Sequence, residues 1–122
     1  MHSLIDTSRK ADISFSAGGC IDIAAGLARR LNLHRGDVIN VAGDDGDLYL
    51  YVQHRAPLQG RYKAQCMPSN KRGGHFRAYS RQLCKAMLDV FGMRGRVRCM
   101  TGETREVAGE PYVTIITKRY IT

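Results

Sequence analysis

Hydrophobic and polar positions alternate along short stretches of the first half of the chain. Ile13 and Phe15 are interleaved with polar residues, and Ile21 and Ile23 follow a glycine pair. This alternation predicts half-buried strands, because successive side chains of a strand point to opposite faces of the sheet. The apolar period then lengthens over 24–33, which predicts a helix of about three turns.

A β-hairpin is predicted after this helix. Apolar runs at 38–41 and 48–52 flank the turn residues Gly43 to Asp47. The Asp-Gly dipeptide within them favours the primed turn whose twist matches that of the paired strands. Calcium loops also contain closely spaced aspartates, but the later glutamate of such a loop is missing here, so we expect a turn.

The second half of the chain repeats this order of elements. It contains a second glycine pair, and Ser80 is a suitable N-cap for an amphipathic segment that follows it. The predicted elements are a turn at 69–74, a strand at 75–79, a helix at 81–91, a strand at 97–99, a loop at 102–111 and a strand at 112–117.

We therefore predict an internal repeat over 12–53 and 62–119 within a single domain, residues 1–122. Each half alone would expose an apolar face, and two halves can bury these faces together. The predicted fold is α+β and β-rich: a small closed barrel of two pseudo-symmetric β-α-β-hairpin units, of swapped-hairpin or double-psi type, with two short helices. Two similar passes in an unrelated α+β domain are the alternative. The alignment equates Gly18-Gly19 with Gly73-Gly74, Ile21-Asp22-Ile23 with Phe76-Arg77-Ala78, and Tyr49-Leu50-Tyr51-Val52 with Tyr112-Val113-Thr114-Ile115.

The first half carries a recognisable order of features: a glycine turn, the Ile21-Asp22-Ile23 strand, a short helix, the Gly36-Asp37-Val38 junction and a hairpin. This pattern resembles the AbrB/MazE-like swapped-hairpin (SpoVT-AbrB) family of bacterial transition-state regulators and antitoxins. The resemblance implies a barrel of two units that binds DNA through basic residues near the first strands and their turn. Here one chain would hold both units, as a monomeric pseudo-dimer or a homodimer.

Positive charge is concentrated in the second half. The 122 residues carry a formal net charge of +8, and residues 61–98 contain ten basic side chains and one acid. Clustered cations favour contact with polyanions, because they release counterions from phosphates; a solvated basic face is the alternative. The candidate nucleic-acid contacts are Lys63, Lys71, Arg72, His75, Arg77, Arg81, Arg94, Arg96 and Arg98.

These features predict a DNA-binding transcriptional regulator or an antitoxin-like protein that contacts DNA through its second half. RNA is a possible ligand in place of DNA, and a toxin is a possible protein partner. The alternative is a protein-interaction or assembly module that keeps the barrel and binds no nucleic acid.

Other chemistry is not indicated by the sequence. The four histidines show no metal-ligand spacing, so we expect no metal, no cofactor and no catalytic residue. The four cysteines form no Cys-x-x-Cys pair and are expected to be reduced, mostly buried thiols. Because the sequence shows neither a secretory signal nor a long apolar run, we expect no membrane association and a cytoplasmic location.

Overall fold

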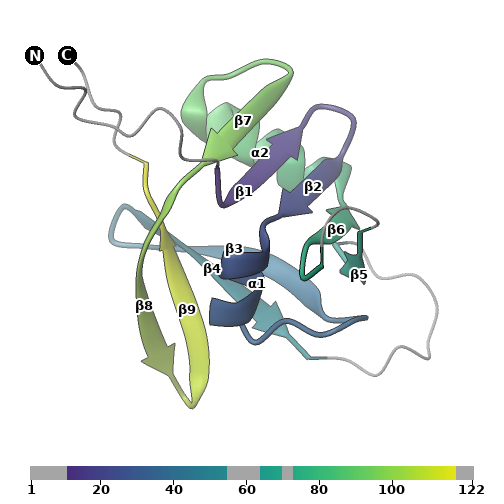
Figure 1. Ribbon diagram of the computed structural model, residues 1–122. Coiled ribbons are helices and arrows are strands. Elements are labelled where there is room, and N and C mark those ends of the chain that lie inside the picture. Colours follow the sequence, from purple (N-terminus) through teal and green to yellow (C-terminus); the bar gives the residue numbers. More distant parts are fainter. Residues whose placement is uncertain (1–10, 55–63, 70–72, 118–122) are drawn as a thin grey trace, which may run out of the picture.

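The computed structural model describes residues 11–54, 64–69 and 73–117 (Figure 1). Within these ranges the protein is β-rich with two short helices, as the sequence predicts, and its strands form two antiparallel sheets. The first sheet has the strand order β5-β6-β2-β1-β7. Its strands are β1 (Ile13–Ser16), β2 (Cys20–Ile23), β5 (Met67–Pro68), β6 (Phe76–Tyr79) and β7 (Arg96–Cys99).

The second sheet has the order β3-β4-β9-β8 and consists of two hairpins. The first hairpin is confirmed, since Asp45 and Gly46 have φ values of 53° and 83°, as a type I′ turn requires. Ala108 and Gly109 form a similar turn in the second hairpin. The strands are β3 (Val38–Asp44), β4 (Asp47–Gln53), β8 (Thr101–Val107) and β9 (Glu110–Ile115).

The prediction of a loop over 102–111 is wrong. Most of it is β8, an edge strand with an exposed and charged surface that includes Glu103, Arg105 and Glu106. Edge strands tolerate such residues because only one side pairs with a neighbour and charge discourages pairing on the other. The strand therefore lacks the apolar alternation from which strands are predicted.

The helices are α1 (Ala25–Arg30) and α2 (Arg81–Phe91). The predicted bounds of α2 are confirmed, and the Ser80 hydroxyl accepts a hydrogen bond from the Leu83 N–H at 3.1 Å. α1 is shorter than predicted, because Asn32 adopts a left-handed φ of 53° and ends the helical segment. No helix in the described ranges is long and apolar enough to cross a membrane.

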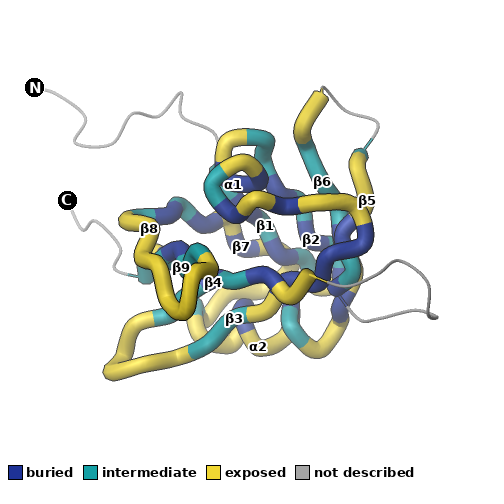
Figure 2. The backbone as a smooth tube through the Cα atoms, turned by 90° about the horizontal axis from the view of Figure 1, so that it is seen from below, coloured by how far each residue is buried: buried dark blue, intermediate teal, exposed yellow. Residues whose placement is uncertain are grey.

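One apolar core joins both sheets and both helices (Figure 2). Phe15, Ile21, Leu50 and Val113 are fully buried and come from strands of both sheets. α2 lies behind the five-stranded sheet in Figure 1 and contacts β1, β2 and β7. α1 is held to the other half of the chain, since Arg30 donates hydrogen bonds to Thr101 and Thr104 of β8.

The predicted closed barrel is not found, because the described strands form two separate sheets. The chain passes from one sheet to the other at Met100, between β7 and β8. Asp12 fixes this bend: its carboxylate accepts hydrogen bonds from the backbone N–H and the hydroxyl of Thr101, at 2.9 and 2.8 Å. Elsewhere, an isolated bridge between Val38 and Gln65 connects β3 to the segment that precedes β5.

The registers of both sheets are symmetric with respect to the predicted repeat. Asp22 of β2 lies opposite Arg77 of β6, and the alignment equates these two positions. Leu50 of β4 likewise lies opposite its counterpart, Val113 of β9. A twofold relation requires this self-pairing, because a residue on the axis meets its own equivalent. The internal repeat stays a prediction, which these registers support.

The cysteines are free, as expected for reduced thiols, and only Cys20 is partly exposed. Burial raises the pKa of Cys66 and of Cys99 to about 12, and burial likewise raises that of Cys84. Because the thiolate is the reactive form, we expect iodoacetamide at pH 8 to modify Cys20 alone in the folded protein and all four cysteines in urea. Mass spectrometry of the labelled protein measures this. Equal native labelling of Cys66 would contradict the burial.

Candidate nucleic-acid interface

The five-stranded sheet has a polar face opposite the core. Along β1, buried Ile13 and Phe15 alternate with half-buried Ser14 and Ser16, and the other strands follow the same period. Because side chains alternate between the two faces of a sheet, the polar residues project away from the core together. We call this surface the outer face; it comprises Ser14, Ser16, Cys20, Asp22, Arg77, Tyr79, Arg96 and Arg98.

Strand register arranges part of the outer face in one row. Arg77 pairs with Asp22, Asp22 with Ser14, and Ser14 with Arg98. With strands about 4.8 Å apart, the row spans about 14 Å and has an arginine at each end. This span is comparable with the ~12 Å width of a DNA major groove.

One of these arginines is already neutralised. Arg77 Nε lies 2.8 Å from Asp22 Oδ1, and about a third of each side chain is exposed. The hydrogen bond that Arg77 donates to Asp22, together with the charge of the carboxylate, raises the pKa of Arg77. Arg77 is therefore half of an ion pair rather than an isolated cation.

Arg96 and Arg98 are placed differently from Arg77. Both are exposed on β7, and within the described residues neither forms an ion pair. Pairing of these arginines with Glu103 or Glu106 is not seen in this part of the chain. Arg94 does not share their strand: it lies in the turn before β7, because Gly95 adopts a φ of 80° there.

The other predicted contacts are dispersed. His75 is half-buried just before β6, and Arg81 is the exposed first residue of α2. Tyr79 adds an aromatic ring to the outer face and is 62% exposed. Such a ring can stack on an unpaired base. Three predicted contacts lie outside the described residues: Lys63, Lys71 and Arg72.

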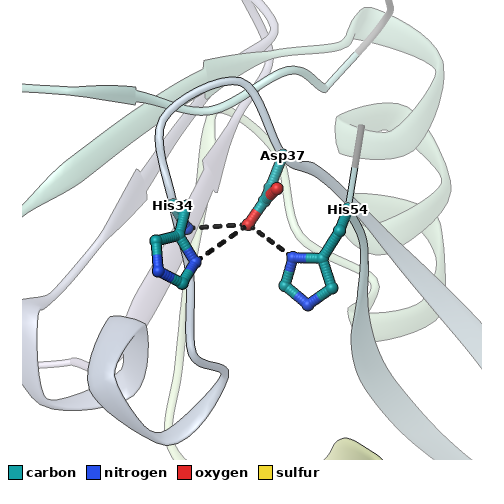
Figure 3. A group of neighbouring side chains, drawn as sticks. All are labelled: His34, Asp37 and His54. Carbon is teal, nitrogen blue, oxygen red and sulfur yellow. Dashed lines mark hydrogen bonds and ion pairs between the residues drawn. The ribbon is translucent and has the colours of Figure 1, made fainter. Parts of the chain in front are cut away.

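A second group of polar side chains lies at one end of the β3-β4 hairpin. The spacing of these residues in the sequence did not predict the group. His34, Asp37 and His54 place one ligand atom each within 4.8 Å of one another (Figure 3). The signal that could have found it is the turn at 45–46. That turn sets a register in which Val38 faces Gln53, so the next pair outward is Asp37 and His54.

Comparison of the chain with models of known protein families, with curated proteins and with solved structures finds no match. The resemblance of the first half to AbrB/MazE-like proteins therefore stays a prediction from the sequence pattern. A function for this protein has to be inferred from the geometry of its surfaces.

Proposed function

We propose that this protein binds DNA through the outer face of its five-stranded sheet and acts as a transcriptional regulator or antitoxin-like protein. The supporting observation is that Arg96 and Arg98 project from one strand without an ion pair in the described residues. Two exposed guanidinium groups on one face are suited to adjacent phosphates, because arginine binds phosphate through a planar fork of donors.

The rest of the outer face fits a groove-binding role. Ser14 and Ser16 are hydroxyl-bearing residues between the arginines of β7 and the ion pair of β2 and β6. Serine can contact phosphates or base edges, and small side chains allow a sheet to approach the duplex closely. We therefore propose that β7 lies along the phosphate backbone and that β1 and β2 face the groove.

The fold supports the same proposal. The symmetric registers of the two sheets are those expected for a single-chain version of a twofold swapped-hairpin unit. The charges, however, are not symmetric, since arginine on β6 faces aspartate on β2. We propose that the DNA contact is correspondingly asymmetric and is made mainly by the second half.

A charge-removal experiment tests the interface. We expect the double variant Arg96→Ala/Arg98→Ala to lose affinity for mixed-sequence duplex. Its plot of log affinity against log salt should be shallower by about 1.8, because each lost phosphate contact removes about 0.9 from the slope. Fluorescence anisotropy, recorded at salt concentrations from low to high, measures both the affinity and this slope.

The matched control removes the same charge elsewhere. Arg29→Ala/Lys85→Ala takes two exposed cations from α1 and α2, outside the outer face. Asp22→Asn is expected to act in the opposite direction, because it releases Arg77 from its ion pair and adds about 0.9 to the slope. Equal losses in the two double variants would contradict the proposed interface.

A protein-interaction module is the second candidate, and a different surface favours it. On the four-stranded sheet, Tyr51 stacks on Tyr112 with ring centroids 4.9 Å apart. Arg105 donates a hydrogen bond to the Tyr49 hydroxyl at 3.1 Å and lies over its ring. Tyrosine and arginine are enriched at protein interfaces. If micromolar protein does not bind duplex even at low salt, this second function is favoured.

A further inference from the structure

The cluster of His34, Asp37 and His54, which we call the His–Asp cluster, joins two segments of the first half (Figure 3). His34 lies in the turn between α1 and β3, Asp37 immediately precedes β3, and His54 immediately follows β4. In Figure 3 both imidazole rings point toward the carboxylate of Asp37.

Asp37 is a buried carboxylate at the centre of this cluster. Its side chain is only 4% exposed, and within the described ranges no lysine or arginine pairs with it. A buried charge is costly unless a counter-charge and hydrogen bonds compensate it. Among the described residues, the two imidazoles and the His34 N–H face this carboxylate, so a cation held between the three side chains would compensate its charge.

The backbone holds the carboxylate in a fixed position. Asp37 Oδ2 accepts a hydrogen bond from the His34 N–H at 2.7 Å, and the Asp37 N–H donates to the His34 carbonyl at 3.0 Å. These two bonds close the turn and bring the His34 ring toward the carboxylate. The same oxygen lies 2.9 Å from His54 Nδ1 and 3.8 Å from His34 Nδ1.

We propose that the His–Asp cluster binds a divalent transition metal, with Zn²⁺ as the best match, through His34 Nδ1, His54 Nδ1 and Asp37 Oδ2. Zinc takes imidazole nitrogen and carboxylate oxygen at about 2.0–2.2 Å, and tetrahedral geometry then separates two ligand atoms by about 3.3 Å. The distances of 2.9 and 3.8 Å lie on either side of this value, and all three ligand atoms lie within 4.8 Å of one another. Coordination would therefore draw the two rings closer together around the ion.

His54 also has a second carboxylate beside its other ring nitrogen, as metal-bound histidines commonly do. Its second ring nitrogen, Nε2, lies 3.4 Å from Glu110 Oε2 in the β8-β9 hairpin. A ligating histidine usually donates its other N–H to a carboxylate, which sets the tautomer and orients the ring. Glu110 is thus assigned as a positioning residue, and it links the metal site to the second half of the chain.

Three protein ligands leave a fourth position for water or for a side chain of a partner. His34 is 67% exposed, so solvent and metal reach the cluster from its side. The bound ion would link the turn before β3 to the end of β4 and, through Glu110, to the β8-β9 hairpin. The site lies at the end of the four-stranded sheet and is separate from the outer face of the other sheet.

The test uses the full chain after treatment with a chelator, with ZnCl₂ and then CoCl₂ as probes. Elemental analysis should give one zinc per chain, and Zn²⁺ should raise Tm by at least about 5 °C, because a ligand that binds only the folded state stabilises it. Cobalt should produce the visible absorption of a four-coordinate nitrogen and oxygen site.

Variants locate the site. His34→Gln changes an exposed side chain and should fold normally, yet it should lose the Tm response and the cobalt spectrum; His75→Gln is the matched control and should keep both. Glu110→Gln should weaken zinc binding by about 10- to 100-fold without abolishing it.

Two outcomes would overturn the proposal. In the first, the wild-type protein shows no response to either metal, which would mean that a protonated histidine alone compensates Asp37. In the second, His34→Gln binds zinc as tightly as the wild type, which would place the ion elsewhere on the chain.

Discussion

Replacement of Phe15 by alanine is expected to lower the free energy of unfolding by about 3–5 kcal/mol. Phe15 is completely buried on β1, where it lies opposite Ile21 of β2 and Val97 of β7. It therefore contributes to the contact between the first half and the second. Its loss removes the transfer energy of a large ring and leaves a cavity that the strands on either side cannot close.

Urea unfolding at 25 °C measures this effect. We expect a lower midpoint with an unchanged slope, because the folded state keeps its compactness. Tyr79→Ala is the matched aromatic control: the ring is 62% exposed, so the loss should stay below about 1 kcal/mol. A Phe15→Ala variant as stable as Tyr79→Ala would contradict the position of the core.

Replacement of Gly19 by alanine is expected to destabilise the protein by at least about 2 kcal/mol. Gly19 has a φ of 98°, a conformation in which an L-residue is strained. A Cβ atom at this position would also lie 2.9 Å from Arg81 Cγ and 3.2 Å from the Arg81 backbone nitrogen. The β1-β2 turn therefore has no room for a side chain at position 19, because Gly19 packs directly on the start of α2.

The neighbouring glycine supplies the control for this variant. Gly18 does not have a positive φ of this kind, and a Cβ there would meet nothing within 4 Å, so Gly18→Ala should change stability by no more than about 0.5 kcal/mol. Thermal and urea unfolding of the two variants compare them directly. If both lose the same stability, the close packing of this turn on α2 is not what requires glycine.

The second glycine turn lies in the same relation to the other helix. Gly74 has a φ of 91°, and its Cβ would lie 3.0 Å from the Cβ of Ala25, the first residue of α1. Each turn thus packs on the first residue of the helix that belongs to the opposite half. This reciprocal contact is a further observation in favour of the predicted repeat.

The predicted repeat within one chain would allow the two halves to differ in charge. In a homodimer, the residue on the twofold axis faces its own copy, and like charges directly opposite are destabilising. Here the two positions carry different residues, Asp22 and Arg77, which form an ion pair. The two proposed sites likewise lie in different halves, with the arginines on β7 in the second half and the His–Asp cluster at the end of the first hairpin.

Local signals account for the elements that were predicted correctly. Ser80 caps α2, and Gly92 ends it in a left-handed conformation with a φ of 62°. The Asp45-Gly46 turn accounts for the first hairpin in the same way. Both depend on interactions between residues a few positions apart, which is why the sequence pattern is sufficient to predict them.

Strand pairing and backbone conformation account for the features that the sequence pattern did not predict. The edge strand β8 has no apolar alternation, and its pairing with β9 depends on the turn at Ala108 and Gly109. The ion pair of Arg77 could not be predicted from its neighbours in sequence, because its partner Asp22 lies 55 positions away. Likewise, the spacing of Arg94, Arg96 and Arg98 by two residues is that of one face of a strand, but the positive φ of Gly95 places Arg94 in the turn before β7.

The β-rich class, α2 and the first hairpin could thus be predicted from periodicity, capping residues and turn dipeptides in the sequence. These features are determined by short-range preferences. The registers of both sheets are consistent with the predicted alignment of the halves. The separation of the strands into two sheets, the ion pair of Arg77 with Asp22 and the proximity of Glu110 to His54 came from the pairing of distant strands and from the bend at Met100. These depend on packing between distant segments, which side-chain preferences along the chain do not encode.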